Sequence, residues 1–213
     1  MAAADKRYEY VVFDVDGTLV DSERANLVSL QQTLLELTGR RYELEDLRFT
    51  LGLPDGPALR QLGFEQPEEA ERAGRRWEQL AEREAASNTV YPGIRSTIEE
   101  LHRRGIGTGV ASSRARHEYA EQISPLGIDD LFDHIVLVED TERHKPEPDP
   151  LLECLRRAGV AAERALYVGD AEYDVRCATS AGVDFALAGW GAQRTYGGER
   201  YVLQRPEDLL ALV

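Results

Sequence analysis

Residues Tyr8 to Thr18 read YEYVVFDVDGT, and this stretch decides how the rest of the chain is interpreted. Tyr8 to Phe13 form a short apolar run typical of a buried β-strand, and a polar turn containing Gly17 follows it. Asp14 and Asp16 stand directly after that run. Because ligands bind at the carboxyl ends of the strands in open parallel sheets, the stretch predicts a strand that holds two carboxylates at a binding site.

Downstream of Pro92 and Gly93, predicted strands alternate with predicted helices. Apolar, β-prone segments predict strands at residues 106–111, 134–138, 165–168, 184–187 and near 201–203. Helical periodicity predicts helices at residues 116–126, 150–158 and 172–181, with a last helix starting at Pro206. This alternation predicts an α/β fold, in which a Rossmann-like parallel sheet carries helices on both faces.

A purely helical block separates the first predicted strand from the others. One predicted helix spans residues 23–38, because leucines recur there at spacings of three and four before Gly39 stops the helix; they are Leu27, Leu30, Leu34 and Leu37. A second predicted helix spans about residues 67–86, and glycines and prolines interrupt the segment between the two. The block therefore predicts an inserted α-helical cap domain at residues 19–89, with a core domain made of residues 1–18 and 90–213.

Polar residues follow four of the predicted strands, and a parallel sheet gathers such residues at one edge. They are Asp14 and Asp16, then Ser112 and Ser113, then Lys145 beyond a short loop, and then Asp170 and Asp174. A carboxylate can attack phosphorus to form an acyl phosphate, and a second carboxylate can serve as general acid and then as base. Carboxylate oxygens also suit Mg²⁺, while a hydroxyl and an ammonium group can stabilise charge on a phosphoryl group.

Each of these residues also has an ordinary structural explanation when it is taken alone. An acidic turn is often only solvated, Ser113 could cap a helix, and Asp174 could favour a helix dipole. Lys145 could lie on the surface, and Arg114 could either contact a substrate anion or occupy a surface position where a helix begins. The order of the polar groups, each after a separate strand, favours a catalytic site.

The ordered set resembles the four motifs of the haloacid dehalogenase-like (HAD) hydrolase superfamily, over nearly the whole chain. The matching segments are DVDGT at Asp14 to Thr18, Ser112 at the end of IGTGVAS, Lys145 in HKPEPDP, and GDAEYD at Gly169 to Asp174. The resemblance implies that Asp14 is the nucleophile and Asp16 the acid and base, with Ser112 and Lys145 as further catalytic residues. It implies Mg²⁺ as the cofactor, held by Asp14, by Asp16 through its backbone carbonyl, by Asp170, and by Asp174 directly or through water.

Within this superfamily the chain is most similar to phosphoglycolate phosphatases, β-phosphoglucomutases and the pyrophosphatases of the same subgroup. Asp16 disfavours dehalogenation, because the dehalogenases of the superfamily lack this residue. The phosphonate-cleaving members use a cap lysine, and residues 19–90 contain no lysine. The resemblance therefore implies a phosphatase that hydrolyses a small organic phosphate monoester through an aspartyl-phosphate. A sugar-phosphate mutase and a pyrophosphatase remain alternatives, and a non-catalytic binding protein is a more distant one.

The resemblance also implies that the cap closes over the site and selects the substrate. Substrate contacts are expected from Thr18, Ser113, Arg114 and Leu53, the last in the turn from Gly52 to Asp55. A mutase needs basic cap groups for a second phosphate, and Arg48 and Arg60 are weak candidates for that role. This scarcity of suitable cations favours hydrolysis over the mutase reaction.

The composition limits the classes of binding partner that are expected. A net charge of −14 disfavours nucleic-acid binding and means that a phosphate site needs a local cation such as Lys145. Cys154 and Cys177 show no disulfide or metal-site spacing. No leader and no apolar run of the ~18 residues needed to cross a membrane is found, so we expect a cytoplasmic protein without membrane contact. A monomer and a homodimer both remain open.

Overall fold

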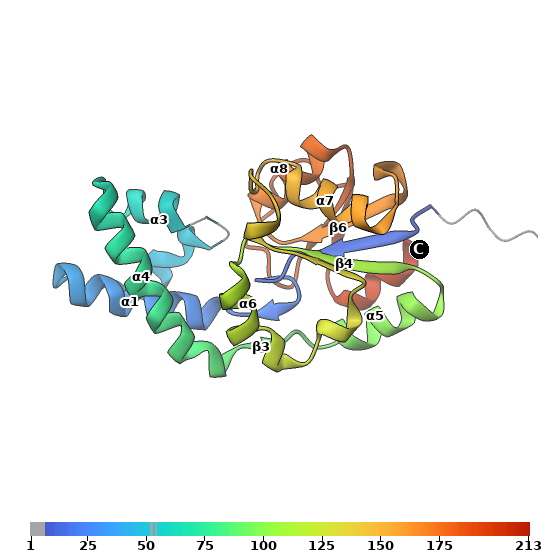
Figure 1. Cartoon of the computed structure of the whole chain (residues 1–213). Coiled ribbons are helices and arrows are strands. Elements are labelled where there is room, and N and C mark those ends of the chain that lie inside the picture. Colours follow the sequence, from blue (N-terminus) through green and yellow to red (C-terminus); the bar gives the residue numbers. More distant parts are fainter. Residues whose placement is uncertain (1–6, 52, 54) are drawn as a thin grey trace, which may run out of the picture. The chain divides into compact units, whose positions relative to one another are not determined.

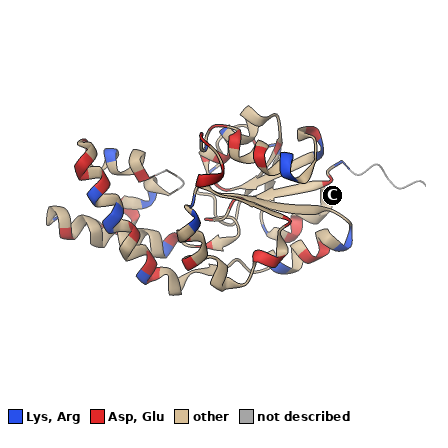
Figure 2. Ribbon diagram, in the orientation of Figure 1, with Lys and Arg blue, Asp and Glu red and all other residues tan. Residues whose placement is uncertain are grey.

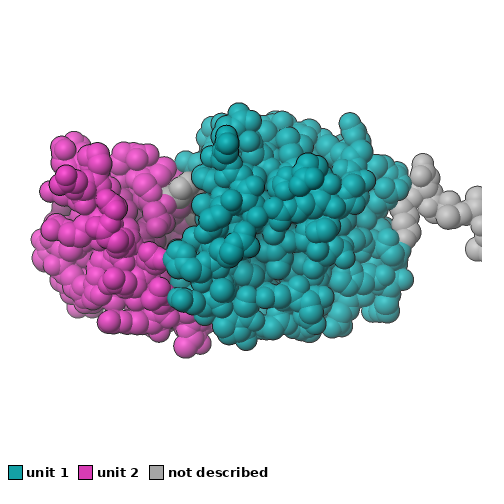
Figure 3. Space-filling view, in the orientation of Figure 1, with its two compact units in different colours: residues 1–21, 90–213 teal, residues 22–89 magenta. Residues whose placement is uncertain are grey.

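The structure is a computed structural model that describes residues 7–51, 53 and 55–213. The chain divides into two compact units, which Figure 3 colours separately. We call Met1–Asp21 with Val90–Val213 the α/β unit, and Ser22–Thr89 the helical unit. The sequence predicts boundaries after residues 18 and 89, and the structure divides after residues 21 and 89.

Six parallel strands form the sheet of the α/β unit, in the order β5-β4-β1-β6-β7-β8 (Figure 1). Their bounds are β1 Tyr10–Phe13, β4 Gly107–Ala111, β5 His134–Val136, β6 Ala165–Gly169, β7 Asp184–Ala188 and β8 Tyr201–Leu203. Phe13 at the end of β1 pairs with Val110 of β4 and with Val168 of β6. The carboxyl ends of these three strands are therefore level, and the residues after them meet at one edge.

The strands form because their residues can be buried on both faces of the sheet. Along β1, Val11 and Phe13 belong to one apolar cluster, while Tyr10 and Val12 belong to the other. This alternation follows the two-residue period of a strand. The predicted α/β fold with a parallel sheet is confirmed.

Helices cover both faces of the sheet. The first face carries α5 (Ile94–Arg103) and α6 (Arg116–Gln122), and the second carries α7 (Asp149–Ala158) and α8 (Glu172–Ala181). The predicted helix at residues 116–126 is too long, because α6 ends at Gln122 and a 3-10 turn at Ser124–Leu126 follows. Pro125 lies in that turn, and it has no N–H to continue an α-helix. The predicted last helix is a 3-10 helix, Pro206–Ala211.

The helical unit contains α1 (Glu23–Thr38), α2 (Leu44–Leu47), α3 (Asp55–Gln61) and α4 (Pro67–Glu84). Its core is one apolar cluster in which leucines of α1 face Ala73 and Trp77 of α4. Gly39 ends α1 in a left-handed conformation with φ of 71°. The predicted helix at residues 23–38 and its apolar face are therefore confirmed.

Two very short strands lie where the chain passes between the units. They are β2 (Val20–Asp21) and β3 (Thr89–Val90), and they form a separate two-stranded sheet. The backbone N–H of Tyr91 also donates to the carbonyl of Leu19 at 3.0 Å. This pair is not predictable from the sequence, because two-residue strands show no periodicity.

Charged residues lie mostly on the helices, whereas the strands of the sheet carry few of them (Figure 2). Cys154 and Cys177 are both buried and unpaired, as expected. Among the described residues, no helix is both long and apolar enough to cross a membrane.

Candidate active site

The site is built at the carboxyl ends of the three central strands. Asp14 follows β1, Ser112 follows β4 and Asp170 follows β6. The backbone N–H of Asp14 donates to the carbonyl of Val168 at 2.9 Å, and that of Ser112 donates to Val136 at 3.0 Å. These bonds extend the ladder of the sheet by one residue, so the side chains leave from fixed backbone positions.

Lys145 lies between two of the carboxylates. Its ammonium nitrogen is 2.6 Å from Oδ1 of Asp14 and 2.8 Å from Oδ1 of Asp174, and its side chain is only 4% exposed. The surface position that sequence reasoning considered for Lys145 is therefore wrong. A buried ammonium is stable only beside opposite charge, and these two carboxylates supply it.

Asp174 is held on both of its oxygens. Oδ1 accepts from Lys145 and, at 2.8 Å, from the hydroxyl of Tyr167, while Oδ2 accepts from the N–H of Ala171 at 3.1 Å. The bond to Ala171 caps the first turn of α8, so the helix-end role that we considered for Asp174 is also present. Tyr167 is a residue of the site that sequence reasoning missed. Its signal was a tyrosine inside an apolar strand, since a buried phenol usually needs a partner.

Asp170 contacts the DVDGT turn. Its Oδ1 accepts from the hydroxyl of Thr18 at 3.1 Å, and Gly17 packs so closely that a Cβ there would overlap the Asp170 carboxyl group. Gly17 also has φ of 73°, in the left-handed region that glycine adopts without strain. The chain therefore needs glycine at this position for two separate reasons.

Asp14, Asp170 and Asp174 form a cluster that could hold a metal ion, with one oxygen of each lying within 4.8 Å of the others. Burial and the neighbouring charges of Asp174 and Asp14 hold the pKa of Asp170 well above its ordinary value. Burial also raises the pKa of Asp14 to about 7, although the charge of Lys145 lowers it. Lys145 bonds to only two of these three carboxylates, so the cluster keeps an excess of negative charge. Hard oxygen donors with such an excess are what a divalent cation such as Mg²⁺ prefers.

Asp16 stands apart from that cluster and is paired with Arg114. Nε of Arg114 is 2.7 Å from Oδ2 of Asp16, and Nη2 is 2.6 Å from Oδ1. The Arg114 side chain is 11% exposed, so the surface role considered for it is wrong. Burial alone would lower the pKa of Arg114, but the charge of Asp16 raises it above the ordinary value.

The two serines differ in their surroundings. Ser112 is 2% exposed, and its oxygen accepts from the backbone N–H of Arg114 at 3.2 Å. Ser113 is exposed, and it does not cap the next helix, because Ala115 occupies the cap position of α6. The N–H of Ala115 is instead satisfied by the carboxylate of Glu118 at 2.7 Å.

Leu53 belongs to the helical unit, where it packs against the apolar cluster of that unit. Its backbone N–H donates to the carbonyl of Thr50 at 3.0 Å. Gly52 and Pro54 of the same turn lie outside the described residues, and Asp55 begins α3. Trp190, which follows β7, donates from its indole nitrogen to the carbonyl of Thr18 at 2.9 Å and so supports the DVDGT turn.

Comparison with known proteins gives one consistent family. A family model for haloacid dehalogenase-like hydrolases matches residues 11–188. The pyrophosphatase PpaX of Bacillus velezensis is 29% identical, over 97% of this chain and 96% of its own. The PpaX of Halalkalibacterium halodurans is 28% identical, over 93% of this chain and 89% of its own.

Solved structures agree with this grouping. A Lactobacillus plantarum protein, provisionally described as a phosphoglycolate phosphatase, has a TM-score of 0.88 and 28% identity, covering 97% of this chain and 99% of its own. A hydrolase from Pseudomonas syringae has a TM-score of 0.81 and 25% identity, covering 95% and 96%. The sequence motifs, the fold and the family match all agree, so the chain belongs to the haloacid dehalogenase-like hydrolases.

Proposed function

We propose that this hydrolase is a Mg²⁺-dependent phosphatase that cleaves a small organic phosphate monoester through an aspartyl-phosphate on Asp14. One observation carries the proposal: Asp14 is bound by the buried ammonium of Lys145 and has the carboxylates of Asp170 and Asp174 beside it. A single carboxylate on a strand end has many explanations. A carboxylate held by a buried cation within an acidic cluster is a pre-organised nucleophile.

The proposed reaction has two steps. In the first, a carboxylate oxygen of Asp14 attacks phosphorus, the bond from phosphorus to the ester oxygen breaks, and Asp16 donates a proton to the leaving alkoxide. In the second, water attacks the phosphorus of the acyl phosphate, Asp16 takes a proton from that water, and Asp14 is regenerated with release of phosphate. Lys145 counters the negative charge that the phosphoryl oxygens bring beside Asp14.

The carboxylates of Asp14 and Asp170, with the backbone carbonyl of Asp16, are the groups proposed to hold Mg²⁺. Asp174 is a less direct ligand in this proposal, because both of its oxygens already accept hydrogen bonds from the protein. When bound, the cation would supply positive charge that balances the carboxylates and the phosphoryl group. Ser112 is proposed to donate its hydroxyl hydrogen to a phosphoryl oxygen.

The proposed substrate contacts are refined by the geometry. Thr18 is better placed to orient Asp170 than to touch substrate, because its hydroxyl already donates to that carboxylate. Ser113 is exposed and remains a proposed polar contact for the substrate. Leu53, in the helical unit, remains a proposed apolar contact for it. Arg48 is bound to Glu23 inside the helical unit, which supports the preference for hydrolysis over a mutase reaction on a second phosphate.

Pyrophosphate is a second candidate substrate, and the curated relatives favour it. The PpaX pyrophosphatases match along most of this chain at identities from 26% to 30%. The same residues would serve, since an anhydride oxygen would leave in place of an alkoxide. Phosphate release measured in parallel from pyrophosphate, phosphoglycolate, sugar phosphates and nucleotides would separate the two candidates by their kcat/KM values.

The experiment that tests the proposal is the Asp14→Asn variant, assayed by Mg²⁺-dependent phosphate release. We expect kcat to fall by more than about 10⁴-fold, because the amide cannot act as the nucleophile. Asp21→Asn is the matched control, since Asp21 is an exposed aspartate that follows the same turn. Substantial turnover by Asp14→Asn would show that another group attacks phosphorus.

A further inference from the structure

Arg114 contacts Asp16 with the geometry of a two-point clamp. The Nε and Nη2 groups donate to different oxygens of one carboxylate, at 2.7 and 2.6 Å. A planar guanidinium that bonds both oxygens fixes the plane of the carboxylate as well as its position. The Asp16 side chain is 33% exposed, and Arg114 bonds to both of its oxygens.

The clamp is itself held in place. The Nη1 group of Arg114 donates at 2.8 Å to the side-chain oxygen of Gln122, which lies on α6 and is only 5% exposed. The backbone of Arg114 is fixed on both sides, because its N–H donates to Ser112 Oγ and its carbonyl accepts from the N–H of Val138 at 3.1 Å. The guanidinium therefore has little freedom to turn away from Asp16.

We infer that Arg114 is a positioning residue that orients Asp16 for proton transfer to the leaving group. The inference rests on the proposed function, because it gives Asp16 the role of general acid. It differs from the expectation that Arg114 binds a substrate anion directly. Three of the five N–H groups of Arg114 donate to Asp16 and Gln122, so most of the guanidinium is already bonded within the protein.

The dependence of the rate on the leaving group distinguishes a positioning role from a binding role. An alkoxide leaves poorly and needs a proton from a well-placed acid, whereas 4-nitrophenolate leaves without much help. Loss of the clamp should therefore slow alkyl phosphates far more than 4-nitrophenyl phosphate. The parameter to compare is kcat/KM, because it reports the steps up to cleavage of the ester and excludes hydrolysis of the aspartyl-phosphate.

The experiment measures kcat/KM for 4-nitrophenyl phosphate and for the alkyl phosphate that the wild type hydrolyses fastest. For Arg114→Gln we expect a loss of about 10²-fold on the alkyl ester and of less than about 10-fold on the aryl ester. Arg114→Lys keeps the charge but cannot bond both oxygens, and we expect the same selective loss from it. Arg116→Gln is the matched control, because Arg116 is two residues away and pairs with Asp140 instead.

The double variant Asp16→Asn/Arg114→Gln completes the test. If Arg114 acts through Asp16, the second substitution should cost the Asp16→Asn enzyme almost nothing further on the alkyl ester. Equal losses on both esters, full activity of Arg114→Lys, or additive losses in the double variant would overturn the inference. A wild type without phosphatase activity, or an active Asp14→Asn variant, would instead overturn the proposed function on which the inference rests.

Discussion

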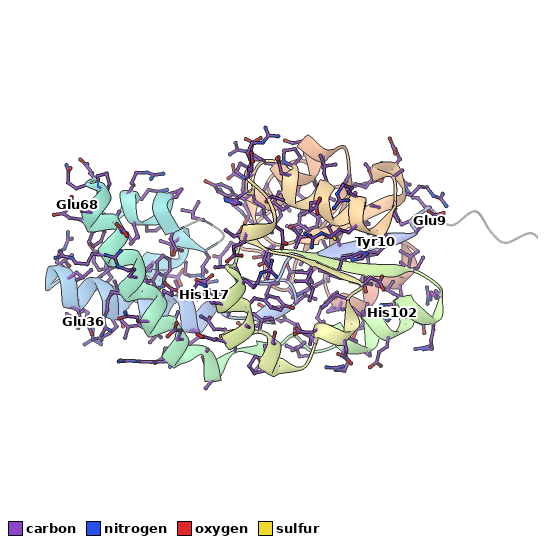
Figure 4. All side chains as sticks on the ribbon, in the orientation of Figure 1. Glu9, Tyr10, Glu36, Glu68, His102 and His117 are labelled. Carbon is purple, nitrogen blue, oxygen red and sulfur yellow. The ribbon has the colours of Figure 1, made fainter. Side chains whose placement is uncertain are left out.

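The α/β unit contains buried charged side chains, whereas the charged side chains described in the helical unit are at least partly exposed. The charged residues that are buried within the described part of the chain are Asp14, Lys145 and Asp174, and all three lie in the α/β unit. In the helical unit the ion pairs are more exposed, as in the pair of Arg76 with Glu36, whose side chains are 26% and 34% exposed. Figure 4 shows Glu36 and Glu68 on the outside of that unit.

The difference shows that buried and exposed charges have different energetic consequences. A buried ion needs an opposite charge and several hydrogen bonds. If such a position served only for packing, apolar residues of similar volume would do as well or better. Exposed pairs contribute little and can change freely. The buried charges of the α/β unit therefore fit the proposed chemistry better than a purely structural role, while the helical unit is constrained mainly by its apolar cluster.

The largest effect is expected when the buried cation is removed. Lys145→Met leaves Asp14 and Asp174 facing one another without an ammonium group. We expect the free energy of unfolding to fall by about 3–5 kcal/mol, which is typical when one partner of a buried ion pair is removed. Chemical denaturation followed by circular dichroism measures this loss. Arg143→Met, on the same loop with a side chain that is 65% exposed, should stay close to wild type, and equal stability of both variants would contradict the comparison.

Magnesium should stabilise the protein through the α/β unit alone. At a concentration about 100 times its Kd, a ligand that binds only the folded state adds about 2.7 kcal/mol to the free energy of unfolding. We expect a rise of several degrees in Tm on adding MgCl₂, and its loss in Asp170→Asn. Asp46→Asn, an exposed aspartate of the helical unit, should keep the full rise. If Asp170→Asn kept it too, Asp170 would not be a ligand.

The two tryptophans offer a matched pair across the units. Trp77 donates to Ser29 Oγ at 3.1 Å in the helical unit, and Trp190 donates to the carbonyl of Thr18 in the α/β unit. Trp77→Phe and Trp190→Phe should each lower the free energy of unfolding by about 1–3 kcal/mol, because each leaves a polar group without its donor. Below the unfolding temperature, only Trp190→Phe should reduce kcat, since it loosens the catalytic turn. A comparable loss of kcat in both variants would contradict the prediction that only the α/β unit carries the reaction.

The smallest effect is expected at a surface carboxylate of the helical unit. Hydrogen bonds from Arg76 and Gln32 lower the pKa of Glu36 to about 2. A lowered folded-state pKa stabilises the protein above the unfolded value of about 4.3, and this contribution is lost as the pH falls toward 2. Glu36→Gln should therefore show a slightly shallower loss of stability than wild type between pH 4.5 and 2. Parallel pH profiles for the two proteins would mean that the pair contributes nothing.

Much of the fold follows from local sequence patterns. The strands of the sheet are almost wholly apolar and the leucine face of α1 is regular, so their positions were predictable within a few residues. The failures have local causes. Pro125 ends an α-helix that periodicity extends, and β2 and β3 are too short to show any pattern.

The site was predictable as a set of residues, but not as a set of contacts. Asp14, Ser112 and Asp170 follow adjacent strands, so the sheet order brings them together once it is known. The contacts of Arg114 with Asp16 and of Tyr167 with Asp174 join segments whose proximity no local pattern encodes. One signal in the sequence was available but unused: the chain has 25 lysines and arginines, and only Lys6 and Lys145 are lysines. At Lys145 the compact ammonium bonds to two carboxylates, a geometry that a planar guanidinium would not reproduce.

The short strands β2 and β3 have a consequence for how such a chain can change over evolution. Leu19 and Tyr91 are hydrogen-bonded to one another within the α/β unit, so the chain leaves that unit and returns to it at a single point. A segment attached in this way can be lengthened, shortened or exchanged without moving β1. The entropic penalty is small, because doubling the length of a flexible loop costs only about 0.6 kcal/mol. The carboxyl edge of the sheet can therefore be inherited unchanged while the inserted segment diverges.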